Sequence, residues 1–388
     1  MYSEQDLRDA VAGGAITSES ADALRAYVAN ARQVPLGDEE NFRLINGFND
    51  IFVAIGVVIM LVAMGAIGQA IAGAVAGGFY PDMVGLSFWD LEGEMAEEFA
   101  VYSNLRDGLS VALGGALVAA TAWPLAEFFT RKRRMALPSI ILLLAFVGGI
   151  FACAVGFGIA AVVNGNDRLA PLVIAGGALL SAGGAWLHWK RFMVPITVAA
   201  GAAAIAGTLV ALIAAAIGPN RENMETIMLS LVFVAGLAVF AFAMRWDMSD
   251  PSRSTRRSDV AFWLHLLAAP MIAHPVFHLL GVTENEALGV GAALGVLAVY
   301  VVFGLVALTI DRRALLVSAL AYVLIALTFL FDRFGAVELT FALTALVIGS
   351  ALLTLSAFWS TIRKAVVEKL PEDLAAHLPA TSVVAVSA

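Results

Sequence analysis

The stretch IFVAIGVVIMLVAMGAIGQAIAGAVA, residues 51–76, runs for 26 residues without a charged side chain. A bilayer core about 30 Å thick is crossed by a helix of roughly 20 apolar residues, so this stretch is long enough to span a membrane. Nine further apolar runs follow, separated by short polar breaks. They lie at about 108–129, 136–163, 169–187, 192–217, 226–244, 260–280, 287–309, 314–331 and 338–358. The sequence therefore predicts an all-α, polytopic membrane protein with about ten transmembrane helices.

The composition agrees with a membrane protein and excludes several other classes. Of the 388 residues, 61% are hydrophobic and 14% are charged, whereas soluble domains average about 45–50% and 25%. A net charge of −8 argues against a nucleic-acid partner. The lone cysteine, Cys153, cannot form an internal disulfide. The first ten residues carry three acids, so we expect no cleavable signal peptide. Motifs for nucleotide, metal or nucleophile chemistry do not occur, so we expect no catalytic set, metal or cofactor.

The distribution of basic residues predicts the orientation. With ten helices and the N-terminus inside, 19 of the 23 Lys and Arg residues fall on the inner side. The four on the outer side are Arg106, Arg168, Arg221 and Arg333. Because short loops rich in Lys and Arg stay in the cytoplasm, both termini are predicted to be cytoplasmic. The expected location is the inner (plasma) membrane of a bacterium.

The N-terminal segment predicts a small helical cap. Leu7 and Val11 suit one face of a first short helix, Gly13-Gly14 breaks it, and Thr17 or Ser18 can cap a second helix. We therefore divide the chain into a cytoplasmic two-helix cap (1–45), a membrane bundle (46–360) and a cytoplasmic tail (361–388). An αα-hairpin of this size cannot bury a full core, so we expect it to pack on the bundle, on a partner or on its own copy.

A family resemblance rests on this cap. The pattern Asp-Leu-x5-Gly-Gly-x-Ile-Thr-x3-Ala-x2-Leu is carried by eight residues: Asp6, Leu7, Gly13, Gly14, Ile16, Thr17, Ala21 and Leu24. With the hydrophobic helices that follow, it resembles a family of uncharacterised bacterial polytopic membrane proteins, classed as domain of unknown function 2157. The resemblance covers under a tenth of the chain. It implies a bacterial inner-membrane location and gives no catalytic residues to carry over to this chain.

The seventh predicted span, 260–280, holds three of the five histidines and two prolines. These residues are His265, Pro270, His274, Pro275 and His278. The prolines should kink the helix and free backbone carbonyls. His274 and His278 share a helix face, and His265 lies on the opposite one. Two interpretations stay open: the imidazoles form a ligand or proton pathway, or each hydrogen-bonds a neighbouring helix. No carboxylate lies near the middle of a predicted span, which argues against a proton antiporter.

Two further groups of charged residues are candidates for a role. Glu127 and Arg131 are four residues apart at an inner helix end, which predicts a structural ion pair. The outer segment 80–107 is acidic, with apolar residues at helical spacing, which predicts an amphipathic helix on the outer interface. Its acidic residues are Asp90, Glu92, Glu94, Glu97 and Glu98.

Two functions remain open from the sequence. The first is transport of a small solute or lipid through the helix bundle, with a path near the seventh span. The second is a non-transporting membrane scaffold, sensor or accessory subunit, which binds a membrane or cytoplasmic protein partner, or its own copy, through the cap and the acidic outer segment. An enzyme is disfavoured because no nucleophile and base stand together in a recognisable pattern.

Overall fold

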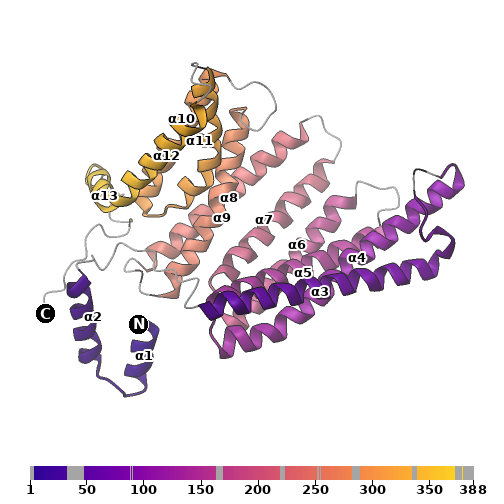
Figure 1. Ribbon diagram of the computed structural model, residues 1–388, viewed down its shortest axis with the longest axis horizontal. Helices are drawn as coiled ribbons and strands as arrows, with labels where there is room; N and C mark the ends of the chain where they lie inside the picture. The colour runs from indigo at the N-terminus through magenta and orange to yellow at the C-terminus, as the bar shows by residue number, and fades with distance from the viewer. Residues whose placement is uncertain are drawn as a thin grey trace.

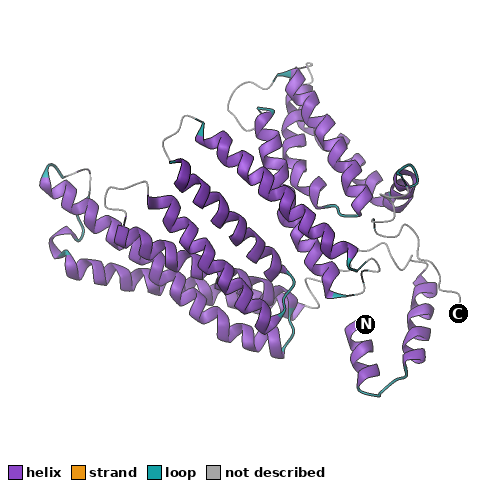
Figure 2. Cartoon of the chain, turned by 180° about the vertical axis from the view of Figure 1, so that it is seen from behind, coloured by secondary structure: helices purple, strands orange, loops and turns teal. Residues whose placement is uncertain are grey.

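Long antiparallel helices follow one another along the chain in the computed structural model (Figure 1). The structure describes residues 4–32, 48–87, 89, 91–162, 169–218, 223–250, 253, 255–281, 289–333, 339–371 and 378. Within these residues each predicted span coincides with one helix, and Figure 2 shows no strand. The helices are α3 (Phe48–Phe79), α4 (Glu94–Ala126), α5 (Ala136–Val162), α6 (Ala170–Phe192), α7 (Ile196–Ile217), α8 (Met224–Met248), α9 (Arg256–Leu279), α10 (Val290–Ile310), α11 (Ala314–Arg333) and α12 (Thr340–Ala357).

Helix length and hydropathy confirm an all-α, multi-pass membrane protein. In the described part of the chain, nine helices are long and apolar enough to cross a bilayer singly. There are ten spans if α12 and α13 (Trp359–Val367), which meet at an angle of 74°, are taken as one broken span. Helix α13 begins at Trp359, close to the predicted tail boundary at 361, and its residues Trp359, Arg363 and Val367 are buried. Residues 372–377 and 379–388 of the predicted tail lie outside the described residues.

Glycine allows α4 and α5 to pack with their backbones in contact. A Cβ on Gly115 of α4 would lie 2.6 Å from the Gly149 carbonyl oxygen of α5. A Cβ on Gly156 of α5 would lie 2.3 Å from the backbone nitrogen of Ala112. Both distances are shorter than any Cβ contact that real side chains make, so only glycine fits. Close backbone approach of this kind is a main source of helix association in lipid.

The acidic outer segment forms a helix, but not the separate interfacial helix that the sequence predicts. Glu94, Glu97 and Glu98 lie in the first turns of α4, which continues without a break to Ala126. Its 33 residues correspond to about 50 Å, longer than the bilayer core, so α4 extends beyond the membrane. Tyr102 of this extension is buried against Ala76 and Met83. Asp90 lies outside the described residues, and Glu92 precedes the helix.

The N-terminal cap has the predicted form. Helices α1 (Glu4–Ala12) and α2 (Ser18–Arg32) are separated at Gly13-Gly14, where Gly14 has a φ of +69° that favours glycine. Thr17 Oγ1 accepts a hydrogen bond from the Ser20 backbone N–H over 3.1 Å and so caps α2. An exposed ion pair of 3.3 Å joins Asp9 of α1 to Arg134 in the turn between α4 and α5.

Helix α9 is the centre of the C-terminal half of the bundle. In the most apolar 18-residue segment of α9, 56% of the residues are buried, a larger share than in the other candidate spans. Its buried side chains pack with α7, α8, α10, α11 and α12 in one core. The turns 133–135, 193–195 and 311–313 lie at the end of the bundle where α3 begins, as do residues 249, 250, 253 and 255 between α8 and α9 (Figure 1). We call this the proximal end and the opposite end the distal end.

Candidate functional site: a buried charged cluster at the proximal end

A three-residue turn between α10 and α11 places two charged side chains inside the bundle. Asp311 ends α10 in the left-handed conformation, with a φ of 57°, which Asp adopts more readily than most residues. The chain reverses there, and the Arg312 backbone N–H donates to the Ala307 carbonyl over 2.9 Å. Asp311 and Arg312 are 8% and 3% exposed.

Asp247, near the end of α8, accepts hydrogen bonds from two other segments. Arg312 Nη2 donates to Asp247 Oδ1 over 2.6 Å, and Arg312 Nε donates to Oδ2 over 3.3 Å. His265 Nε2 of α9 lies 2.8 Å from the same Oδ2. Since a carboxylate only accepts, Nε2 of His265 carries the hydrogen. One carboxylate therefore joins α8 to α9 and to the α10–α11 turn.

Arg312 also binds the first turn of α9. Its Nη2 lies 3.2 Å from both the backbone oxygen and the hydroxyl of Ser258. The guanidinium of the α10–α11 turn thus binds both the end of α8 and the beginning of α9.

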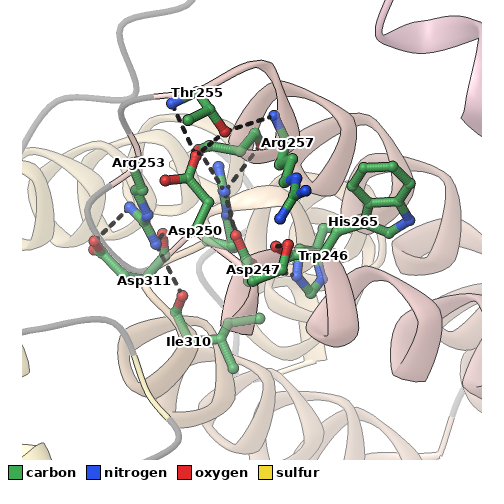
Figure 3. A network of polar contacts seen from close by, with 12 residues as sticks. Trp246, Asp247, Asp250, Arg253, Thr255, Arg257, His265, Ile310 and Asp311 are labelled. Atoms are coloured by element: carbon green, nitrogen blue, oxygen red, sulfur yellow. Dashed lines mark hydrogen bonds and ion pairs between the residues drawn. The ribbon is translucent and has the colours of Figure 1, made fainter.

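Asp311 binds the second half of the cluster. Arg253, in the α8–α9 loop, donates from Nη1 to Asp311 Oδ2 over 2.7 Å and from Nη2 to the Ile310 carbonyl over 3.2 Å, as Figure 3 shows. Trp359 of α13 donates from Nε1 to Asp311 Oδ1 over 2.7 Å. Arg363, one turn further along α13, lies 3.7 Å from the same oxygen. The α8–α9 loop and α13 are therefore both fixed to the α10–α11 turn.

Asp250 binds Thr255, the residue before α9. Its Oδ2 accepts from the backbone N–H of Thr255 over 2.9 Å and from the Thr255 hydroxyl over 2.7 Å (Figure 3). Thr255 in turn caps α9 by accepting from the Arg257 backbone N–H. Burial, and after it the charge of Arg312, lowers the pKa of the Arg253 guanidinium from its usual value, while Asp311 acts in the opposite direction. An arginine remains charged under these conditions.

We call this set of residues the charged cluster. It comprises Asp247, Asp250, Arg253, Ser258, His265, Asp311, Arg312, Trp359 and Arg363. Its three carboxylates and three guanidiniums balance one another when His265 is neutral. Removing an ion from water costs several kcal/mol, and an ion pair recovers this only with good geometry and further hydrogen bonds. The bidentate contact of Arg312 with Asp247 is of that kind.

The structure separates the histidines that the sequence groups in the seventh span. His265 is 3% exposed and belongs to the cluster. His274 is exposed, and its Nδ1 lies 2.7 Å from the hydroxyl of Tyr322 on α11. His278 Nε2 lies 3.8 Å from Glu225 of α8, towards the distal end. His265 and His274 therefore each hydrogen-bond a neighbouring helix, the second of the two interpretations.

Helix α9 stays helical through Pro270 and Pro275. The bundle-facing side chains between the histidines, such as those of Ala269 and Ala273, are fully buried. A groove of about 400 Å³ lies elsewhere, between α12 and α13, and is lined by Val347, Ser350, Ala351, Thr354, Leu355 and Ile362. Among the described residues, no group of three His, Cys, Asp or Glu could hold a metal ion.

Glu127 has a second partner besides the predicted one. Arg131 Nη1 lies 3.4 Å from Glu127 Oε2, in the pairing that the spacing predicts. Arg191, at the end of α6, makes the shorter contacts, 2.5 Å from Nε to Oε1 and 3.0 Å from Nη2 to Oε2. All three side chains are partly exposed. The arrangement joins α4 to α6 outside the charged cluster.

The sequence analysis missed Asp247, Arg253, Asp311 and Arg312 as site residues, because charges next to an apolar run are ordinarily solvated loop residues. One feature, the short connection between two of the helices, could have indicated these residues. Only three residues, Asp311, Arg312 and Arg313, separate α10 from α11, and a turn this short holds its charges close to the ends of neighbouring helices.

Trp359 provides the first test of the cluster. Phe at this position keeps the ring and removes the donor to Asp311. A hydrogen bond to a charged group contributes about 1.5–3 kcal/mol, so we expect Trp359→Phe to destabilise the protein by about that amount. Thermal unfolding in detergent measures the loss. Trp186→Phe is the matched control, because Trp186 is 58% exposed; an equal shift in both variants would contradict the assignment.

In comparisons with known proteins, no family model matches the chain, and neither a curated protein nor a solved structure matches it.

Proposed function

We propose that this protein is a membrane carrier for a small solute or lipid, in which the charged cluster closes the proximal end of the helix bundle. The single observation that carries this proposal is the position of the Asp247–Arg312 pair. It is 2–3% exposed and is the point at which α8, α9 and the α10–α11 turn meet. A carrier needs such a closure, which must hold in one state and separate in another.

Energetics favour a switching role over a merely stabilising one. Apolar side chains of equal volume often stabilise a buried site as well as an ion pair does, or better. Ionisable groups within a membrane protein are therefore a pointer to function. Ion pairs suit a gate, because they hold segments in one register and, once water enters, each charge is readily solvated.

The cluster joins the parts that a gate would move. Asp247 and His265 belong to the long helices α8 and α9, whereas Asp311, Arg312 and Trp359 belong to a short turn and a short helix. If Arg312 leaves Asp247 and Arg253 leaves Asp311, the α10–α11 turn and α13 separate together from α8 and α9, because Trp359 stays bound to Asp311. We propose that these two parts move relative to each other.

The proposed location is the inner membrane of a bacterium, with the proximal end and both termini in the cytoplasm. The support is the basic character of the short proximal loops. The resemblance of the cap to uncharacterised bacterial membrane proteins supports the same location.

Transport is tested in proteoliposomes with two sets of probes. Osmotic swelling reports entry of amino acids, sugars and polyols, and dithionite quenching reports movement of a fluorescent phospholipid. We expect protein-dependent flux of at least one probe, and at least a tenfold change in that flux in Asp247→Asn. Glu127→Gln is the matched control, because it alters a proximal carboxylate outside the cluster. Absence of flux for every probe, or equal flux in Asp247→Asn and the parent, would contradict the proposal.

A scaffold or sensor is the second candidate, and the exposed face of the cap favours it. Tyr27 and Leu24 of α2 are 71% and 42% exposed, which suits contact with a partner protein or a second copy. Tyr27→Ser with Leu24→Ser should then abolish a complex that the parent forms in crosslinked membranes. Identical crosslinked species in both proteins would eliminate this candidate.

A further inference from the structure

We propose that His265 binds a proton that opens the gate, so that the carrier is coupled to proton uptake from the proximal side. The inference rests on the proposed function and names its coupling ion. The geometry that carries it is a single carboxylate, Asp247, shared by an imidazole and a guanidinium.

The first step concerns the protonation state of His265. Its Nε2–H donates to Asp247 Oδ2 over 2.8 Å, so the neutral ring has its lone pair on Nδ1. Nδ1 is buried, and no residue that the structure describes accepts from it or donates to it. The ring lies edge-on to Phe240, with 5.2 Å between the centroids. The proton-accepting atom is therefore present and unoccupied by any other hydrogen bond.

The second step concerns the charge that a proton would add. With neutral His265, the carboxylates of Asp247, Asp250 and Asp311 balance the guanidiniums of Arg253, Arg312 and Arg363. A proton moving from water to Nδ1 makes His265 a cation and leaves the cluster with one uncompensated positive charge. Uncompensated charge in a buried site is costly, so the cluster must rearrange or admit water.

The third step identifies the contact that breaks. Oδ2 of Asp247 is shared, because His265 Nε2 and Arg312 Nε both lie within 3.3 Å of it. Protonation strengthens the His265 contact, since hydrogen bonds between two ions are about twice as strong as neutral ones. It also gives His265 and Arg312 the same positive charge, so that two cations that repel each other share one carboxylate. Arg312 is the group that leaves, because it sits on a short turn outside the helices and has two alternative oxygen partners on Ser258, whereas His265 is fixed within α9.

The electrostatic field at His265 depends on the charged groups of the elements that pack against α9. Helices α7 and α10 contain no charged residue, and the charged residues of α11, Asp332 and Arg333, lie at its distal end. Asp247, Arg312 and Arg253 act on His265 directly. Further charged groups near this end are Arg245, Asp250, Arg256, Arg257, Asp259, Asp311, Arg313, Arg363 and Lys364. Asp259 is partly exposed, and the charges of Arg312 and, after it, Arg256 act on it. Asp259 and Arg256 add one charge of each sign at the edge of the cluster and leave its balance unchanged.

This mechanism differs from the midplane antiporter that the sequence argues against. The proton site lies on α9 nine residues after Arg256, where it meets Asp247 near the end of α8, and it operates the closure. The proton enters from proximal water and returns to water when the gate closes.

The experiment measures opening directly, by electron–electron double resonance in the full-length protein in lipid nanodiscs. Cys153→Ala removes the native thiol, and spin labels at Ser249→Cys (end of α8) and Ser360→Cys (α13) report the separation across the cluster; both positions are exposed. Samples are frozen at pH 8 and at pH 5. We expect one distance at pH 8 and a second, longer population at pH 5.

Substitutions at three positions assign the effect. Gln at 265 keeps a donor to Asp247 and cannot be protonated, so His265→Gln should show the short distance at both pH values. His265→Arg, a permanent cation, should show the longer population at both. Asp247→Asn should also open at both, because it removes the charge that holds Arg312. His278→Gln is the matched control and should keep the response of the parent.

The outcomes separate this inference from the proposed function. A pH response that persists in His265→Gln, or a parent that does not respond, overturns the proton site. If Asp247→Asn nevertheless shows the longer distance, the proposed gate is retained and only the proton site is rejected. If no variant changes the distance and Asp247→Asn also leaves proteoliposome flux unaltered, the gate and the proton site both fail.

Discussion

Replacing Arg312 by Leu is expected to destabilise the protein by about 3–5 kcal/mol, because it leaves the buried carboxylate of Asp247 without its cation. Asp247→Leu should cost a similar amount, since it strands Arg312 and removes the acceptor of His265. The double variant should cost clearly less than the sum of the two, because neither charge is then left alone. The measurement is thermal unfolding of the detergent-solubilised protein, followed by size-exclusion chromatography of a fluorescent fusion.

Arg313→Leu is the matched control for this cycle. Arg313 belongs to the same turn, but it is exposed and lies over the Trp359 ring, with its guanidinium carbon 4.7 Å from the centroid. A cation–π contact at an exposed site is worth about 0.5–1 kcal/mol, so its loss should be small. Additive effects of the Arg312 and Asp247 substitutions, within about 0.5 kcal/mol, would contradict the pairing.

Gly156→Leu is expected to abolish folding of the α4–α5 pair. Even the first atom of a side chain at 156 would lie 2.3 Å from the Ala112 nitrogen and 2.6 Å from the Gly108 carbonyl oxygen. Backbone atoms cannot move aside as a side chain does, so the helices must separate. Gly156→Ala should already cost at least about 1–3 kcal/mol through overpacking. The measurement is the yield of monodisperse protein and its melting temperature.

Gly148→Ala, on the same helix, provides the opposite expectation. No atom lies within 4 Å of the Cβ that it would add. Alanine is favoured over glycine in a helix by about 0.5–1 kcal/mol, so this variant should be as stable as the parent or more stable. Equal melting temperatures for Gly156→Ala and Gly148→Ala would show that α4 and α5 do not touch at Gly156.

The helices were predictable because lipid imposes one strong rule. A run such as residues 51–76 has too few polar groups to remain in water, and its backbone must pair internally, so it forms a helix. This rule predicts where the chain crosses the membrane, but it does not predict at which residue each helix begins or ends. Helix α4 starts at Glu94, well before the predicted span at 108, because acidic residues limit the length within the lipid but do not end a helix.

The charged cluster was not predictable from local sequence. Asp247 and Arg312 are 65 residues apart, and each stands beside an apolar run where a solvated loop residue is expected. Their burial depends on how three helix ends stack, which is a tertiary property. His265 was found because a histidine inside an apolar span is unusual by itself. Its partner could not be named, since the choice between Asp247, Asp250 and Asp259 depends on the rotation of α8 against α9.

The most direct test of the gate is chemical labelling of Ser258→Cys in membrane vesicles, in the Cys153→Ala background. Residue 258 is 8% exposed and its hydroxyl lies 3.2 Å from Arg312 Nη2, so a thiol there reacts only when the cluster separates. Ala273→Cys, at a fully buried site in the middle of α9, reports general unfolding.

In inverted vesicles with a membrane-impermeant maleimide, we predict slow labelling of Ser258→Cys at neutral pH. Labelling should be at least tenfold faster when Asp247→Asn is added, with Ala273→Cys unreactive in both proteins. Equal labelling of Ser258→Cys with and without Asp247→Asn would contradict the proposed gate. Faster labelling in right-side-out vesicles than in inverted ones would contradict the proposed cytoplasmic location of the proximal end.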